Sequence, residues 1–368
     1  MNHSISRRTF SKLIGVTAAS AAVGSVPILN FSAARPATGI VRLSSNENPY
    51  GPSTDALKAM TEAFSLAWRY PDEYADQLTA ELAKLHSVPD EQILLGDGSG
   101  EILKLSAAAF AGKDKKVVIA NPTFEAIARH SGVAGADVVK IDLTSDYRHD
   151  LEKMLAAANN AGLVYICNPN NPTASITPKN EITQFLQKVP RTTNVLVDEA
   201  YHHYVESKDY ETLIPLVKDY PNLIVARTFS KIYGMAGLRC GYCVTQRPNI
   251  SAMRTHQVFD SVNIMALVAA TASLKDNEHV TRGRKVNAEV RKIVCDELDS
   301  LGYRYIPSHA NFMMIDLRRE VRPVISALLS RGVEVGRLFP ALPNFMRVTI
   351  GTRDQMKSFM AAFREVMA

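Results

Sequence analysis

The residue best placed to do covalent chemistry in this sequence is Lys231. It follows residues 223–226, an apolar run rich in β-branched side chains that is typical of a buried strand. In open α/β sheets, ligands bind in the crevice beyond the carboxyl ends of the strands, where such a lysine can meet them. Thr228, Ser230 and Arg239 stand close by in the sequence and are suited to hold a phosphate. The stretch predicts a lysine that forms a Schiff base with pyridoxal phosphate (PLP), with a surface lysine as the alternative.

A glycine-rich turn follows another predicted strand, residues 93–95, and opens a predicted helix. The turn contains Gly98, Ser99 and Gly100. Glycines at a strand-to-helix turn free backbone N–H groups at the positive end of the helix dipole, which suits a phosphate. The turn does not match the G-x-G-x-x-G pattern of dinucleotide-binding proteins, so a dinucleotide is not expected.

Aromatic, amide and carboxylate side chains follow three further predicted strands, which are expected at residues 117–120, 163–167 and 195–197. Phe124 follows the first strand, and its ring could stack on a planar cofactor or fill the core. Asn171 follows the second within a proline-rich turn that fixes its amide at the edge of the sheet. Asp198 follows the third, with Tyr201 shortly after it. A carboxylate in this apolar setting needs a cation, and a protonated pyridine nitrogen is one.

The elements that must position these residues alternate between short apolar runs and helical stretches, the pattern of a mostly parallel sheet with crossover helices. A sixth strand is expected at residues 241–244. Helices are expected at residues 55–67 and 77–86, and a long helical region at 251–301. Beyond it, the segments that look like strands of a smaller domain are 311–315, 333–335 and 345–350. The predicted fold class is α/β, with helices on both faces of the large sheet and a smaller α+β domain at the C-terminal end.

The N-terminal segment resembles a targeting signal rather than part of the fold. Residues 6–12, Ser-Arg-Arg-Thr-Phe-Ser-Lys, resemble the twin-arginine export signal, and a weakly apolar run and a possible cleavage site follow. An amphipathic first helix is the alternative. The signal predicts export to the periplasm by the twin-arginine translocase, after the protein has folded with its cofactor. We therefore expect four segments: a signal at 1–34, an extended arm at 35–54, a large domain at 55–260, and a connecting helix with a small domain at 261–368.

The composition excludes several classes of protein. The chain has 368 residues, of which 46% are hydrophobic, and a net charge of +5, which is ordinary globular material. No long basic run with interleaved aromatic residues occurs, so no nucleic-acid partner is expected. Cys240 and Cys243 have the C-x-x-C spacing, but they fall in or beside a predicted strand, and no second Cys or His pair would complete a zinc site. They are predicted to be core residues, and no metal site is expected.

Seven motifs in order resemble those of class I/II (fold type I) PLP-dependent aminotransferases, and most closely the histidinol-phosphate aminotransferases. The resemblance covers residues 42–352. The motifs are Asn-Glu-Asn-Pro-Tyr-Gly-Pro-Ser at 46–53, Tyr-Pro-Asp at 70–72, Asn-Pro-Asn-Asn-Pro-Thr at 168–173, Val-Asp-Glu-Ala-Tyr at 197–201, Arg-Thr-Phe-Ser-Lys at 227–231, Gly-Leu-Arg-Cys-Gly at 237–241 and Arg-Val-Thr-Ile-Gly-Thr at 347–352. One departure is Ala174, where the family usually has glycine at a turn that can demand a positive φ angle.

The resemblance implies a role for each candidate residue toward the cofactor. Lys231 would carry PLP and Asp198 would pair with its pyridine nitrogen. Phe124 would stack on the ring, while Asn171 and Tyr201 would bond to the ring oxygen. The residues implied to hold the phosphate are Gly98, Ser99, Gly100, Thr228, Ser230 and Arg239, with Tyr70 reaching it from a neighbouring subunit. A homodimer with shared active sites is therefore implied.

On the substrate side, the resemblance implies that Arg347 binds an α-carboxylate through two hydrogen bonds. Asn46 and Tyr50, in the arm, would close over the substrate. Arg337 falls near the expected position of a distal anion. It would meet a phosphate or a second carboxylate, or it is a surface arginine.

The implied activity is PLP-dependent transfer of an amino group between an amino acid or histidinol phosphate and a 2-oxo acid such as 2-oxoglutarate. Lys231 would move a proton as general base and then as acid. A decarboxylase or β-lyase on the same fold stays open, because the ring-binding residues do not choose which bond breaks. A secreted binding protein without catalytic activity is the alternative from another class. The export signal leaves the substrate open, because an enzyme of histidine biosynthesis has no evident reason to leave the cytoplasm.

Overall fold

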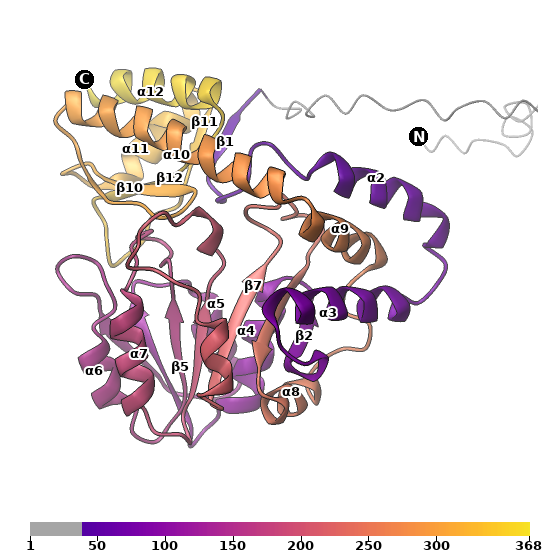
Figure 1. Cartoon of the computed structure of the whole chain (residues 1–368). Coiled ribbons are helices and arrows are strands. Elements are labelled where there is room, and N and C mark those ends of the chain that lie inside the picture. The colour runs from indigo at the N-terminus through magenta and orange to yellow at the C-terminus, as the bar shows by residue number, and fades with distance from the viewer. Residues whose placement is uncertain (1–38) are drawn as a thin grey trace, which may run out of the picture. The chain divides into compact units, whose positions relative to one another are not determined.

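A computed structural model describes residues 39–368 of the chain, and its central feature is a seven-stranded sheet (Figure 1). The strand order is β2-β8-β7-β6-β5-β3-β4. The strands are β2 (Ile93–Gly96), β3 (Lys116–Asn121), β4 (Val138–Asp142), β5 (Ala161–Cys167), β6 (Asn194–Asp198), β7 (Leu223–Thr228) and β8 (Gly241–Thr245). β3 to β7 are mutually parallel and β8 is antiparallel to both its neighbours. Because β2 and β7 are both antiparallel to β8, β2 is parallel to β7, and the carboxyl ends of six strands, β2 to β7, meet at one edge of the sheet.

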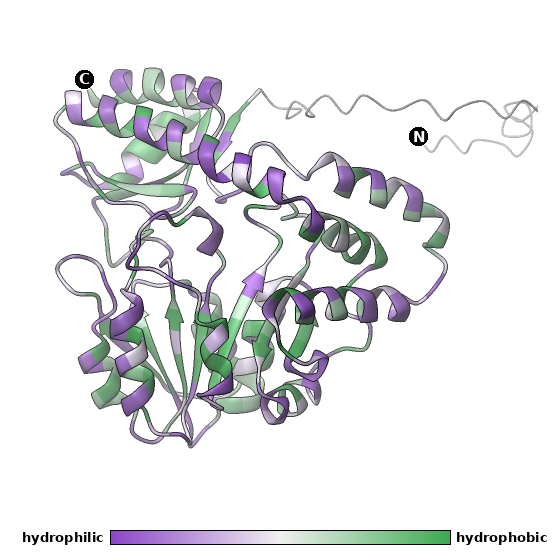
Figure 2. Cartoon of the chain, viewed as in Figure 1, coloured by the Kyte–Doolittle hydropathy of each residue, from purple (hydrophilic) through white to green (hydrophobic). Residues whose placement is uncertain are grey.

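Helices cover both faces of this sheet because its side chains alternate between two apolar cores. Val117 and Ile119 pack in one core while Val118 packs in the other. Figure 2 shows the strands as largely hydrophobic and most helices as a mixture of hydrophobic and hydrophilic residues, with α9 largely hydrophobic. The helices of this part are α2 (Thr54–Ala63), α3 (Asp72–His86), α4 (Ser99–Phe110), α5 (Ala126–Val133), α6 (Leu151–Ala157), α7 (Lys179–Lys188), α8 (Arg247–Arg254) and α9 (Ile264–Lys275), with short 3-10 turns η1 (Phe64–Leu66), η2 (Asp90–Gln92), η3 (His202–Tyr204) and η4 (Ile214–Lys218).

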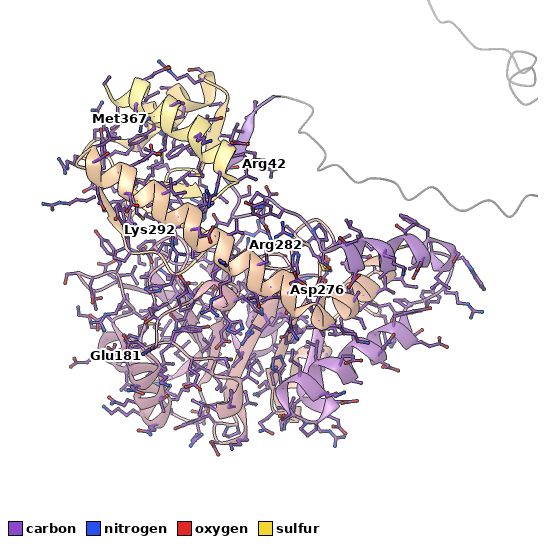
Figure 3. The ribbon with its side chains drawn as sticks, turned by 45° about the horizontal axis from the view of Figure 1, so that its top comes forward. Arg42, Glu181, Asp276, Arg282, Lys292 and Met367 are labelled. Carbon is purple, nitrogen blue, oxygen red and sulfur yellow. The ribbon has the colours of Figure 1, made fainter. Side chains whose placement is uncertain are left out.

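A smaller group of elements has its own apolar core, built around a three-stranded antiparallel sheet. Its strands are β9 (Arg304–Ile306), β10 (Phe312–Asp316) and β12 (Phe345–Thr349), and its helices are α10 (Asn277–Ser300), α11 (Val321–Ser330) and α12 (Arg353–Met367). The arm strand β1 (Val41–Leu43) pairs in parallel with β11 (Val333–Val335), which attaches the arm to this smaller lobe. α10 joins the two lobes, and Figure 3 labels Asp276, Arg282 and Lys292 along it.

The change from one core to the other falls within α10. Val280 packs against the core of the large sheet, whereas Val286 and Val290 pack in the smaller core. α9 lies beyond the boundary predicted at residue 260, yet its buried side chains belong to the core of the large sheet. Among residues 39–368, no helix has the length and apolar composition needed to cross a membrane. The predicted export signal lies outside these residues.

The predicted strands of the large sheet all occur, with ends displaced by no more than two residues. One prediction of extent was wrong, and three strands of the described residues were not predicted. The helix predicted to start at residue 77 begins at Asp72, because Pro71 ends the preceding segment and two acidic residues, Asp72 and Glu73, suit the first helical turn. The edge strand β4 was not predicted, because none of its residues is fully buried and it has no apolar run. β1 and β9 were also missed, at three residues each.

Candidate active site

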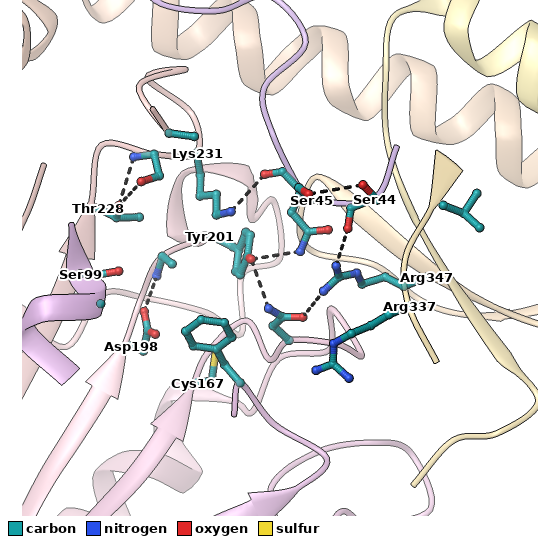
Figure 4. Close-up of a pocket in the computed structure, with 18 of the residues that line it drawn as sticks. Ser44, Ser45, Ser99, Cys167, Asp198, Tyr201, Thr228, Lys231, Arg337 and Arg347 are labelled. Carbon is teal, nitrogen blue, oxygen red and sulfur yellow. Dashed lines mark hydrogen bonds between the residues drawn. The ribbon is translucent and has the colours of Figure 1, made fainter. Parts of the chain in front are cut away.

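A cavity of about 730 Å³ lies where the carboxyl ends of β5, β6 and β7 face the arm and the smaller lobe (Figure 4). Most of the candidate residues line it. They are Asn46, Ser99, Gly100, Phe124, Asn171, Asp198, Tyr201, Thr228, Ser230, Lys231, Arg239, Arg337 and Arg347. Gly98 stands immediately before Ser99 at the start of α4. Residues from five strand ends and from the arm thus meet in one cavity.

Lys231 enters the cavity from the loop after β7, and its amine faces the arm. Its Nζ donates to the backbone oxygen of Asn46 at 3.2 Å and lies 5.4 Å from the centre of the Tyr201 ring. Burial lowers the pKa of Lys231 from 10.5 to about 8, and the positive charge of Arg347 acts in the same direction. A substantial fraction of this amine is therefore neutral near pH 8, as a nucleophilic amine requires.

Asp198 ends β6 as a buried carboxylate with a pKa raised to about 6, mainly by burial. The Tyr165 hydroxyl donates to its Oδ2 at 2.9 Å, and the backbone N–H of Ala200 donates to its Oδ1 at 3.1 Å. No arginine, lysine or histidine of residues 39–368 forms an ion pair with it. A buried carboxylate held by two neutral donors still lacks a cation, which a cationic ligand can supply.

The start of α4 and the loop after β7 form a corner suited to an anion. Gly98 has φ +73°, and a side chain there would overlap the Arg239 guanidinium, so only glycine brings these groups together. Thr228 Oγ1 donates to Ser230 Oγ at 3.0 Å, and both hydroxyls line the cavity. Hydroxyls, a helix N-terminus and an arginine are the groups that bind phosphate.

Tyr201 connects the arm to the strand ends through hydrogen bonds. Its hydroxyl accepts from Asn46 Nδ2 at 3.1 Å and from Asn171 Nδ2 at 3.5 Å. Burial raises the pKa of Tyr201. Phe124 is 39% exposed and lines the cavity, so the alternative of a core phenylalanine does not hold.

Arg347 projects from β12 into the side of the cavity opposite Lys231's loop, beside Arg337 (Figure 4). It donates to Asn171 Oδ1 at 2.8 Å and to the backbone oxygen of Ser44 at 2.7 Å. Its Nε is buried without a partner among the described residues. Arg337 Nη2 lies 2.6 Å from Glu125 Oε2, and both side chains are more than half exposed, at 55% and 62%. The two arginines therefore differ, because Arg347 is held by neutral groups and Arg337 by a carboxylate.

Comparison with known proteins agrees with this arrangement. Residues 38–363 match the family model described as aminotransferase class I and II. The chain belongs to this family. It is 40% identical to the histidinol-phosphate aminotransferase of Moorella thermoacetica over 333 residues, which cover 89% of this chain and 86% of that one. The corresponding protein of Brevibacillus brevis is 38% identical, with 90% and 91% covered.

A solved structure from the same family is similar throughout the described part. The histidinol-phosphate aminotransferase from Sinorhizobium meliloti, solved in complex with pyridoxal-5′-phosphate, has a TM-score of 0.83 and 28% identity, and the match covers 89% of this chain and 91% of that chain. The α/β class predicted from the alternation of strands and helices is confirmed as the fold type of this family.

Besides Gly98, two predicted site residues of this family member do not line the cavity of the single chain. Tyr70 is 82% exposed on the segment between α2 and α3, and Tyr50 is 47% exposed in the arm. Neither contributes to the cavity wall.

Several residues of the cavity wall were not predicted. Cys167 lies within β5 rather than after it, so the sequence does not distinguish it from a core residue. The same holds for Tyr165, which is fully buried and donates to Asp198 without lining the cavity. Ser44 and Glu334 meet only because β1 pairs with β11, and Ser44 Oγ donates to Glu334 Oε1 at 2.9 Å. No local sequence pattern carries that long-range pairing.

The remaining sequence predictions concern the turn at Ala174 and the cysteines. Ala174 has φ +59°, so the turn does adopt the positive φ angle for which the family usually has glycine. Cys240 and Cys243 are buried, unpaired by disulfides and packed in different cores, as expected of core residues. Within residues 39–368, no group of three potential ligands is arranged to hold a metal ion.

Proposed function

We propose that this protein is a PLP-dependent aminotransferase that moves an amino group between histidinol phosphate or an amino acid and a 2-oxo acid such as 2-oxoglutarate. The observation that carries the proposal is that Lys231 and Asp198 face one cavity, the first with a lowered pKa and the second without a cationic partner. Relatives at 40% and 38% identity are histidinol-phosphate aminotransferases, which supports the same chemistry here.

The residues present fit PLP at each of its functional groups. Asp198 supplies the buried carboxylate for the pyridine nitrogen, and the corner formed by Gly98 and Arg239 accepts the phosphate. Phe124 offers a ring for stacking, and Tyr201 offers a hydroxyl to the ring oxygen. When bound, PLP supplies the electron sink that stabilises negative charge on the substrate carbon.

The chain's own residues bind the substrate and move its proton. Arg347 would bind the carboxylate of an amino-acid or 2-oxo-acid substrate once its bonds to Asn171 and Ser44 rearrange, because a guanidinium can donate two parallel hydrogen bonds to such a group. Lys231 Nζ would take the proton from the substrate's α-carbon as a general base, and the resulting ammonium would return it as a general acid. Asn46 holds the arm across the site by its bond to Tyr201, which limits the access of water.

The proposal includes a homodimer with shared active sites. Exposed aromatic residues gather near the α2–α3 connection, where Trp68 is 76% exposed and Tyr70 is 82% exposed. Phe259 is 93% exposed and lines a groove together with Pro71, so it lies beside this segment. Apolar surface of this kind is typical of a protein–protein contact. A second copy bound there would bring its own Tyr70 toward the phosphate corner of this chain, which is formed by the start of α4 and the loop after β7.

The test of the activity is product analysis with a matched variant. The wild-type protein and Lys231→Ala are purified with PLP, treated with borohydride and examined by peptide mass spectrometry. We expect a PLP adduct on the peptide that contains Lys231 in the wild type and none in the variant. Incubation with an amino donor and 2-oxoglutarate should form glutamate. Carbon dioxide, or pyruvate with ammonia, would instead indicate a decarboxylase or β-lyase, and no adduct at all would support a binding protein.

We also propose that the protein is exported to the periplasm by the twin-arginine translocase. The proposal rests on the Arg7-Arg8 pair and its neighbours, which lie outside the described residues. Replacement of both arginines by lysine should retain the protein in the cytoplasm, as measured by cell fractionation. Equal amounts of the wild type and the variant in the periplasm would contradict a twin-arginine route.

A further inference from the structure

One carboxylate, that of Glu125, pairs with a cation of the proposed substrate site. Arg337 lines the cavity, and its Nη2 lies 2.6 Å from Glu125 Oε2. The two residues come from different parts of the fold. Glu125 stands between β3 and α5 of the large sheet, and Arg337 follows β11 of the smaller lobe. The ion pair therefore bridges the two lobes beside the cavity.

The Arg337 guanidinium is oriented by an aromatic ring that it shares with Arg347. The central carbon of Arg337 lies 4.5 Å from the centre of the Phe339 ring, and that of Arg347 lies 5.2 Å from the same point. The guanidinium groups of Arg337 and Arg347 therefore both form cation–π contacts with the Phe339 ring. Within the described part of the chain, Glu125 is the one carboxylate that forms an ion pair with either of them.

This ion pair is exchangeable. Both side chains are more than half exposed, and a pair between exposed side chains contributes little to stability. Within residues 39–368, Arg337 makes one other hydrogen bond, from its Nη1 to the backbone oxygen of Leu338 at 3.0 Å. Its remaining N–H groups are free to turn toward an incoming anion, and Glu125 can release the guanidinium at little cost to the fold.

We propose that Glu125 is a specificity-determining residue that competes with the substrate for Arg337; this inference rests on the proposed function. A donor whose phosphate or carboxylate reaches Arg337 must displace Glu125 and then lies close to that negative charge. A donor without an anionic group at this position binds with the ion pair intact. Glu125 therefore reduces the preference for anionic donors by repulsion, which is one of the two ways in which a site gains specificity.

The test compares two donors that differ only in the phosphate, namely histidinol phosphate and histidinol, with the PLP-loaded enzyme. The variant is Glu125→Gln, which keeps the shape of the side chain and removes its charge. The control is Glu365→Gln, because Glu365 forms a comparably exposed ion pair with Arg331 at 3.1 Å outside the cavity. Glu125→Gln should raise the ratio of kcat/KM for histidinol phosphate to that for histidinol about three- to tenfold. The change should come from KM rather than kcat. It should become smaller at high ionic strength. Glu365→Gln should leave the preference unchanged.

A second background separates competition for Arg337 from a general effect of charge. In Arg337→Gln, the further change Glu125→Gln should no longer alter the preference, because the contested cation is gone. An unchanged preference in Glu125→Gln, or a gain of the same size without Arg337, would overturn the inference. Calorimetric binding of both donors measures the same preference without turnover. Binding selectivity without any amino transfer would count against the proposed function alone, whereas transfer with unaltered selectivity would count against Glu125 alone.

Discussion

The reactivity of Lys231 is set by its neighbours. Burial and the charge of Arg347 lower its pKa to about 8. We predict that PLP added to the cofactor-free protein is captured covalently at a rate that rises about tenfold per pH unit below pH 8 and levels above it, because the neutral amine is the nucleophile. Stopped-flow absorbance measures this rate, and Lys231→Ala should show no covalent phase. A rate that still climbs between pH 9 and pH 10 would mean that the amine titrates like an exposed lysine.

Asp198 lowers the stability of the cofactor-free protein, because its buried carboxylate has no cationic partner until a cation binds. Its folded pKa of about 6 lies above the ordinary value of 3.8, so between these values the folded state binds more protons than the unfolded state. The stability contributed by this group is therefore full below about pH 4 and is lost as the pH rises through about 6. We predict that cofactor-free Asp198→Asn is more stable than the wild type at pH 8, by up to about 3 kcal/mol at 1.36 kcal/mol per pKa unit.

Urea unfolding at pH 4 and pH 8 checks this prediction. The extra stability of Asp198→Asn should vanish at pH 4, where the carboxyl of the wild type is already neutral. The same variant should bind PLP more weakly than the wild type. The Tyr165 hydroxyl, which donates to Asp198, can accept from the new amide, so the variant keeps its local bonds. A gain of equal size at both pH values would show that charge is not its cause.

At this scale, the sequence predicts residues that follow strands and misses those that act from elsewhere. Lys231 and Asp198 were found because each follows an apolar run that predicts a buried strand, and ligands bind beyond the carboxyl ends of such strands. Tyr165 was missed because it lies inside β5, where a buried tyrosine has the pattern of a core residue. Glu125 was missed because its partner Arg337 is remote in sequence and meets it only in the folded chain.

Among the elements, the junction of α4 and β8 decides how well the phosphate corner is formed. A side chain at Gly241 would collide with the backbone of Gly98 and Ser99, where flexible atoms cannot move aside. We predict that Gly241→Ala displaces the start of α4 and weakens PLP binding at least about tenfold, because it destroys the arrangement of N–H groups there. Gly237→Ala is the control, since a side chain there meets nothing within 4 Å. Fluorescence titration with PLP measures both, and equal affinities would contradict the prediction.

The elements that the sequence predicts best are those whose environment is uniform along their length. Each residue of β5 is buried, so it appears as a continuous apolar run. β4 lies at the edge of the sheet without a fully buried residue and has no such pattern. β1 cannot be predicted locally, because its three residues are fixed by pairing with β11 of the smaller lobe.

The whole molecule assembles the site from segments far apart in the sequence. Asn46 of the arm donates to Tyr201 of the large sheet, and its own backbone N–H donates to Thr349 of β12 at 2.9 Å. Asn311 donates to the backbone oxygen of Asn46 at 3.1 Å, which ties the arm to β10 as well. The arm therefore couples both lobes at the proposed substrate site, and its position depends on the complete fold.

The proposed dimer extends this dependence to a second copy, and the exposed aromatic residues give a direct test. Phe259 is 93% exposed beside the segment that carries Tyr70. We predict that Phe259→Glu converts a dimer to a monomer, because a charge cannot be buried in an apolar contact without a partner. PLP affinity should fall about tenfold or more with it, because the site loses the Tyr70 of the second copy. Sedimentation velocity and PLP titration measure the two effects.

The control for that experiment is Val133→Glu, which also places a charge at an exposed apolar residue, 86% exposed, but at the end of α5. It should leave both the assembly and the PLP affinity unchanged. Tyr70→Phe separates the apolar contact between the two copies from the hydrogen bond of the Tyr70 hydroxyl, because it keeps the ring and removes the hydroxyl. It should sediment as a dimer but bind PLP more weakly. If it binds PLP as the wild type does while Phe259→Glu does not, the second copy supports the site through the contact itself and not through a hydrogen bond from Tyr70.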